Sequence, residues 1–148
     1  MKYPYPYGGT TGTVAKVREG NSCTLRFVLD DEGDAIPNSA VTAATYSLYD
    51  HATHEVINNL HNIDVSASIS ALGVVTVNLH EDDNIIVGDP DQAEELHVLV
   101  FEATANAAPN QLSVREEIGI IVQNLPFYER HTEGGTVYKT VRLMWRTL

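Results

Sequence analysis

Apolar and polar residues alternate with a period of two through most of the body of the chain. In residues 22–29 every second position is apolar, from Cys23 to Leu29. This period is typical of a β-strand with one buried face. Strands are predicted at 13–18, 22–29, 43–49, 55–59, 63–69, 72–79, 96–103 and 112–123. Turn signals separate them, and no convincing helix alternates with them, so the pattern predicts an all-β fold: an antiparallel β-sandwich of about seven strands.

The segment 96–103 is the strongest candidate for a central strand. Its sequence LHVLVFEA carries apolar side chains on both faces, and His97 shares a face with Leu99 and Phe101. Residues 94–100 include good helix formers, but the run VLVF and its period favour a strand. We expect this strand to be covered on both sides.

The chain divides into an N-terminal arm (1–12), a β-sandwich (13–123) and a C-terminal arm (124–148). In the first arm Tyr3, Tyr5 and Tyr7 alternate with prolines and precede two glycines. Proline fixes φ and removes a hydrogen-bond donor, so this arm favours polyproline II. Amphipathic tyrosine rings suit a groove on a partner. A frayed terminus is the alternative.

The C-terminal arm places an alternating segment, 136–148, after the Gly134-Gly135 pair. We expect a β-strand beyond a hinge, with docking on a neighbouring chain by β-augmentation. The alternative is that the strand folds back onto its own sheet. The residues of this arm that we expect to bind a partner are Tyr138, Arg142, Trp145 and Arg146.

Charge is distributed unevenly over these three parts. The net charge is −11, yet residues 1–18 hold three basic and no acidic residues, and residues 130–148 hold four basic residues and one acidic residue. Residues 19–129 hold nineteen acidic residues against Arg26 and Arg115. An acidic body repels nucleic-acid phosphates. Basic ends are attracted to acidic protein surfaces, including those of sister copies, which favours a homo-oligomer; the body's acids also serve solubility.

Nothing in the sequence indicates catalysis. It contains no nucleophile-elbow motif and no phosphate-binding glycine motif, so we expect a non-enzymatic protein without a cofactor. Cys23, the single cysteine, lies in an apolar run and is expected to be buried. No run of about 18 apolar residues is present, so no membrane partner is expected.

Metal-ligating residues are sparse and poorly spaced. His51 and His54 flank a turn, but zinc normally takes three or four ligands with defined spacing, and a solvated hairpin tip is the simpler interpretation. We expect no metal site. The weak calcium candidates lie in the acidic connection 81–95, which lacks EF-hand spacing: Asp82, Asp83, Asp89 and Asp91, with Glu94 and Glu95 beside them.

The body resembles the Ig-like domains of tailed-bacteriophage virion proteins. The likeness covers about 105 residues, in the runs EGNSCTLRFVLDDEGDAI, ATYSLYDHATHEVI, VVTVNL, HVLVFEATA and VREEIGIIVQN. It is a pattern of strands and carries no catalytic residues. The disulfide and core tryptophan of antibody domains are missing.

This resemblance implies a structural component of a virion, with other virion proteins as partners. Together with the two arms it favours a neck or collar subunit that forms a ring at the head–tail connection. Capsid decoration, a tail or baseplate component, and a module that binds host-surface glycans are the alternatives. The N-terminus lacks the apolar region of a secretory signal, so we expect assembly in the host cytoplasm.

Overall fold

The computed structural model describes residues 15–106 and 111–124 in full, and the backbone of 136–144 and 146–147. Within these residues the chain forms ten β-strands and three short 3₁₀ turns, η1 (Asn38–Ala40), η2 (Ser66–Ser68) and η3 (Glu81–Asp83). The described residues contain no α-helix, and so no helical segment that could cross a membrane. The predicted all-β class is confirmed.

The larger sheet is built around two long strands, β7 (Glu94–Ala105) and β8 (Leu112–Gln123). Its order is β1-β8-β7-β4-β5, with β1 (Ala15–Arg18), β4 (Val41–Asp50) and β5 (Ile63–Asp64). The pairs β4–β7 and β7–β8 are antiparallel, whereas β1 lies parallel to β8. β10 (Arg146–Thr147) pairs with the start of β8.

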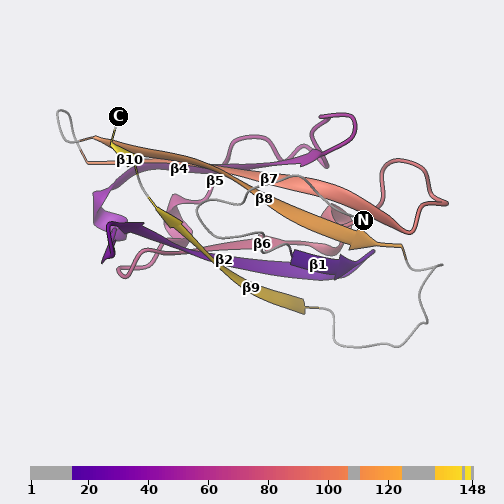
Figure 1. Cartoon of the computed structure of the whole chain (residues 1–148), viewed down its shortest axis with the longest axis horizontal. Coiled ribbons are helices and arrows are strands. Elements are labelled where there is room, and N and C mark those ends of the chain that lie inside the picture. The colour runs from indigo at the N-terminus through magenta and orange to yellow at the C-terminus, as the bar shows by residue number, and fades with distance from the viewer. Residues whose placement is uncertain (1–14, 107–110, 125–135, 145, 148) are drawn as a thin grey trace.

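The smaller sheet is centred on β2 (Ser22–Asp31). It pairs antiparallel with β3 (Asp34–Ala35) and β6 (Val74–Leu79), and parallel with β9 (Thr136–Met144). Figure 1 shows the two sheets as two layers, with β4, β7 and β8 in one and β2, β6 and β9 in the other. The architecture is consistent with a β-sandwich.

The main core lies between the sheets and is formed by alternate positions of the long strands. Cys23, Leu25, Phe27 and Leu29 of β2 are fully or almost fully buried, as the alternation predicted. Phe27 meets Phe101 of β7 edge to face, with ring centroids 5.0 Å apart. Edge-to-face pairs add favourable energy beyond the area that they bury.

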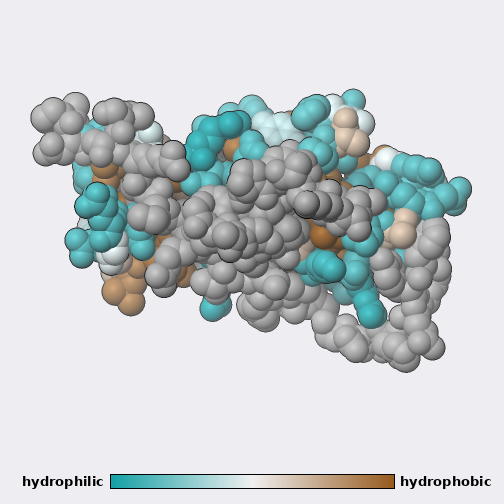
Figure 2. Space-filling view, in the orientation of Figure 1, coloured by the Kyte–Doolittle hydropathy of each residue, from teal (hydrophilic) through white to brown (hydrophobic). Residues whose placement is uncertain are grey.

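A second apolar cluster shows that β7 is covered on both faces, as predicted. Leu96, Val98 and Val100 of β7 pack with Ile121 of β8 and are all buried. Because side chains alternate along a strand, this cluster lies on the face of the larger sheet opposite to Leu99 and Phe101. The described surface seen in Figure 2 carries both hydrophilic and hydrophobic residues.

Three strand predictions need correction between β4 and β6. Residues 55–59 form no regular strand. They return along β4 only at the isolated Tyr49–Val56 bridge and two flanking hydrogen bonds, from the Asp50 amide to the Glu55 carbonyl and from the Ile57 amide to the Leu48 carbonyl. Asn58, Asn59 and Asn62 adopt positive φ, which interrupts extended pairing. The predicted strand 63–69 is reduced to β5 and the 3₁₀ turn η2. Leu72, expected in a strand, lies in a turn and is 72% exposed.

The strand expected in the C-terminal arm is present and pairs within its own chain. β9 runs along β2 from the Ser22–Thr136 pair to the Asp30–Met144 pair, all in parallel register. β10 then pairs with Leu112 and Ser113 of the other sheet. The single chain therefore shows the fold-back arrangement that the sequence left as an alternative to docking on a neighbour.

Candidate functional site

Buried polar residues gather at one end of the sandwich, which we call the polar end. It is the end at which β4 and β8 finish and β7 begins. The polar end comprises Asp50, Asp83, Asn84, Glu95, His97 and Asn124. Burying a polar group costs free energy unless it has a partner, so such a concentration requires an explanation.

The centre of the polar end is formed by Asp50, Glu95 and His97. Asp50 is the last residue of β4 and lies opposite His97 in the β4–β7 register. Glu95 and His97 are two apart on β7, so both side chains lie on the face that carries Leu99. A ligand-capable atom from each of the three lies within 4.8 Å of the other two.

Glu95 is a fully engaged carboxylate. Its Oε1 accepts from the Val87 amide at 2.8 Å and lies 2.6 Å from His97 Nε2. Its Oε2 accepts from the Gly88 amide and from Gln92 Nε2, each at 2.8 Å. Burial by itself raises the pKa of Glu95, but the hydrogen bonds from His97, Val87 and Gly88 outweigh it and lower the pKa below 4.5.

His97 and Asp50 each retain one polar atom without a partner. His97 is 0% exposed and its Nδ1 makes no hydrogen bond. Asp50 is 2% exposed; its Oδ2 accepts from the amide and hydroxyl of Thr53, whereas its Oδ1 is unpartnered. Because Glu95 is ionised at neutral pH and accepts only, His97 Nε2 must carry the proton of that contact.

The remaining polar residues fix loops around this centre. Asn124 Nδ2 donates to the Pro90 and Gln92 carbonyls at 2.6 and 2.7 Å, which fastens the 84–93 loop to the end of β8. Asp83 accepts from Asn58 Nδ2 at 2.6 Å and from the His80 amide at 2.8 Å. Side chains therefore hold the loops at this end together with backbone hydrogen bonds, such as that from the Asn124 amide to the Ala93 carbonyl at 2.9 Å.

The calcium candidates do not come together in this arrangement. Asp82, Asp89 and Asp91 are exposed, whereas Asp83 is buried with both oxygens engaged. Asp89 Oδ1 accepts from the Asp91 amide at 2.9 Å in a local turn. Within the described residues only Asp50, Glu95 and His97 place three possible ligand atoms close together.

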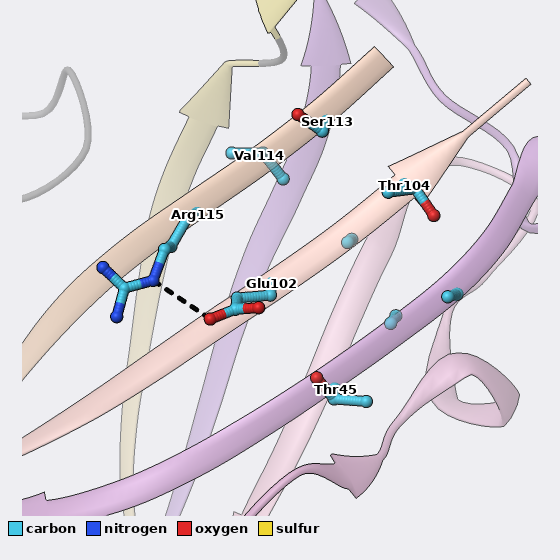
Figure 3. A pocket seen from close by; sticks show the side chains of 9 residues that line it. Thr45, Glu102, Thr104, Ser113, Val114 and Arg115 are labelled. Carbon is cyan, nitrogen blue, oxygen red and sulfur yellow. Dashed lines mark hydrogen bonds and ion pairs between the residues drawn. The ribbon is translucent and has the colours of Figure 1, made fainter. Parts of the chain in front are cut away.

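A shallow hollow lies on β4, β7 and β8. Its lining includes Thr45, Glu102, Thr104 and Ser113, and Arg115 Nε donates to Glu102 Oε1 at 3.0 Å. Figure 3 shows Glu102 and Arg115 reaching toward each other from neighbouring strands. Hydroxyl groups and one exposed ion pair therefore line this hollow beside apolar residues, without an aromatic ring. The apolar residues are Ala43, Ala44, Ala103 and Val114.

The expected partner-binding residues fall only partly within the described structure. Tyr3, Tyr5, Tyr7 and Trp145 lie outside it. The backbone of β9 places Tyr138 opposite Thr24 and Arg142 opposite Val28. In β10, Arg146 pairs with Ser113. The first two of these pairs lie on the smaller sheet and the third on the larger.

Sequence reasoning named Glu95 only as a neighbour of the calcium candidates and did not connect it with Asp50 or His97. A signal was present, because Glu95 and His97 continue the buried alternation of Leu99 and Phe101, where a polar pair is unusual. Asp50 could not be added from the sequence, since its place opposite His97 depends on the β4–β7 register.

The chain was also compared with protein-family models, with curated proteins and with solved structures, and none of the three comparisons found a match.

Proposed function

We propose that this chain is a non-enzymatic, Ig-like structural subunit of a tailed-phage virion, assembled in the host cytoplasm, which forms a neck or collar ring by exchange of its C-terminal strand. The strand order supports the Ig-like part. β4, β7 and β8 stand in one sheet as strands C, F and G do in Ig domains, and β2 and β6 in the other as strands B and E do. Phe27 and Phe101 make the contact between strands B and F that a disulfide makes in antibody domains.

The observation that carries strand exchange is the parallel pairing of β9 with β2. It covers Ser22 to Asp30, nearly the whole of β2, so this edge of the sheet depends on the C-terminal arm. Backbone pairing of this kind is indifferent to which copy donates the strand. A neighbour's β9 in the same register would make the same hydrogen bonds.

The segment between β8 and β9 is long enough for exchange. β8 ends at Gln123, which pairs with Arg18, and β2 begins only four residues after Arg18. When β9 pairs with β2 of its own chain, the connection from the end of β8 therefore has only a short distance to span. The connection 124–135 has about a dozen residues and could extend over roughly 40 Å, enough to reach an adjacent subunit.

Charge supports contact between copies. The arm from residue 130 onward is basic, and the body that β9 would join on a neighbour is strongly acidic. Attraction of this kind favours association and weakens as salt rises. Head-to-tail donation of one strand per subunit closes into a ring when the rotation between subunits allows it.

Disulfide trapping distinguishes exchange from fold-back. Thr24→Cys with Tyr138→Cys, in a Cys23→Ala background, places thiols on a paired position of β2 and β9. Under mild oxidation exchange gives covalent multimers on a non-reducing gel, whereas fold-back gives a cross-linked monomer. Thr24→Cys with Lys139→Cys is the matched control, because adjacent strand positions face opposite sides.

Assembly itself is tested by solution mass from light scattering at low and high salt. We expect the full chain to form a discrete oligomer that loosens with salt, and a chain lacking residues 130–148 to lose it. An unchanged oligomer after this deletion contradicts arm exchange. A monomer at every salt concentration supports a capsid decoration, or a tail or baseplate component recruited to a preformed particle.

One observation favours a second candidate, a module that binds host-surface glycans. The hollow with Thr45, Thr104, Ser113 and the Glu102–Arg115 pair offers donors and acceptors suited to sugar hydroxyls. A glycan array with the intact chain, with and without calcium, tests it. Glycan binding by the parent that is lost in Arg115→Ala supports this candidate function. Absence of binding to any glycan on the array contradicts it.

A further inference from the structure

From the polar end we infer a binding site for a divalent transition metal of the zinc type, with Asp50 and His97 as ligands and Glu95 as the residue that orients His97. This site is independent of the strand-exchange function proposed above. It rests on three buried side chains from two strands whose ligand-capable atoms lie within 4.8 Å of one another.

The unpartnered atoms are the two that a metal would bind. Once Nε2 of His97 donates to Glu95, the other nitrogen, Nδ1, offers a lone pair and has no donor facing it. Oδ1 of Asp50, on the cross-strand neighbour, is likewise an acceptor without a donor. Two buried acceptors on paired residues each lack a positively polarised partner, and a metal cation would supply one.

The surrounding contacts match those around metal ligands. A metal-bound histidine almost always donates its second ring nitrogen to a carboxylate, carbonyl or water, as His97 does to Glu95 at 2.6 Å. A ligating carboxylate is itself hydrogen-bonded, as Asp50 is to Thr53 at 2.8 and 3.2 Å. Imidazole nitrogen with carboxylate oxygen suits zinc and its neighbours better than calcium, which takes only oxygen ligands.

A surface hollow reaches Asp50 and Glu95, although His97 does not line it, and the charge around this hollow favours cations. Its rim carries Asp89 and Glu94. These carboxylates attract cations to the mouth of the site. The metal would tie the end of β4 to the start of β7, and through Glu95 to the Val87 and Gly88 amides of the neighbouring loop. The protein supplies two ligands, so water molecules would complete the coordination, and we expect weaker binding than at a site with four protein ligands.

The test uses the full chain, stripped with a chelator and titrated with ZnCl₂ by calorimetry at pH 7.5, with thermal melts at each metal concentration. We expect one equivalent of zinc to bind and to raise the melting temperature, while calcium does not. Asp50→Asn and His97→Gln should weaken binding about 100-fold or more, and Glu95→Gln roughly 10-fold. His61→Gln, at an exposed histidine that is not one of the three clustered residues, should bind zinc as the parent does.

Two outcomes overturn the inference. Absence of saturable zinc binding by the parent chain means that a water molecule or a proton satisfies Nδ1 and Oδ1. This result does not depend on whether any variant folds. Equal zinc binding by the parent, Asp50→Asn and His97→Gln means that exposed histidines hold the metal. Cobalt substitution gives a separate spectroscopic readout, since ligation by His97 changes the visible spectrum of Co²⁺ and His97→Gln abolishes that change.

Discussion

The middle of the sandwich and its polar end are both held together across the two sheets, but by different kinds of interaction. In the middle Phe27, Phe101 and Leu99 are buried among apolar neighbours, and non-directional hydrophobic packing holds the two sheets together. At the polar end Glu95 and Asn124 fasten loops through directed hydrogen bonds. The middle should respond to lost volume, whereas the polar end should respond to lost charge and to pH.

The largest expected effect comes from the middle. Phe101→Ala removes the edge-to-face contact with Phe27 and leaves a cavity between the sheets. We expect it to lower the free energy of unfolding by about 4 kcal/mol, measured by urea denaturation. Val87→Ala, at a residue that is 53% exposed, serves as the control and should stay within about 0.5 kcal/mol of the parent. Equal losses would mean that the two sheets are not joined by this core.

The next effect concerns the turn at the far end of the sandwich from the polar end. Gly73 has φ +77°, and a Cβ there would lie 2.6 Å from the Leu29 carbonyl oxygen and 2.8 Å from that of Ile36. Gly73→Ala should cost on the order of 3 kcal/mol, from backbone strain and steric overlap together.

Gly33 separates these two causes. It also has positive φ, +96°, but nothing lies within 4 Å of the position of a Cβ. Gly33→Ala should therefore cost about 1 kcal/mol, from backbone strain alone. Similar losses in the two variants would show that the close approach of the Leu29 and Ile36 carbonyls is relieved at no cost, and would remove the steric part of the argument.

The polar end gives the third effect. Glu95→Gln replaces a carboxylate that accepts four hydrogen bonds, and should lower stability by about 2 kcal/mol at pH 7 in the presence of a chelator. The lowered pKa of Glu95 fixes the sign of the pH dependence. Its stabilisation is present above pH 4.5 and is lost as pH falls through the folded-state pKa.

The gap between parent and Glu95→Gln should accordingly close on acidification. Melting curves from pH 7 to pH 3 measure it. Glu94→Gln, at the adjacent position of β7, is the matched control and should show no such convergence. A gap that stays constant to pH 3 would contradict the ionised, hydrogen-bonded state of Glu95.

The same contrast explains what could be predicted from the sequence. Period-two alternation predicted β2, β7 and β8 and placed Cys23, Leu25 and Phe27 in the core, because packing depends on which face a side chain occupies. It gave a wrong result at 55–59 and 63–69, where asparagines at positive φ and hydrogen bonds specific to the site decide the backbone. Local pattern carries no information about such contacts.

The candidate metal site was beyond reach for a related reason. Glu95 and His97 share a face by local geometry, but Asp50 joins them only through a pairing of residues 47 positions apart. The other histidines gave no hint either, since only the spacing of His51 and His54 in the sequence pointed to a possible metal site. A site that depends on strand register needs the fold before it can be recognised.

The last effect returns to the apolar middle and tests whether pH matters there at all. Burial raises the pKa of the Cys23 thiol from 9.0 to about 11. The Cys23 thiol ionises at a lower pH in the unfolded chain than in the folded chain. Cys23 therefore leaves the free energy of unfolding unchanged below pH 9 and lowers it as pH rises from 9 to 11. At pH 10 the loss should be about 1.4 kcal/mol relative to pH 8.

Cys23→Ala isolates this contribution from the tyrosines and lysines that titrate in the same range. The variant should be less stable than the parent at pH 8, because it leaves a small cavity, and the difference should shrink by about 1.4 kcal/mol at pH 10. Thiol labelling checks the same burial directly, since Cys23 should react only when the chain unfolds. Two results together would show that β2 opens toward solvent: a stability difference that does not change between pH 8 and pH 10, and rapid labelling of the folded chain. Such opening is expected of a sheet edge that readily exchanges its β9 partner.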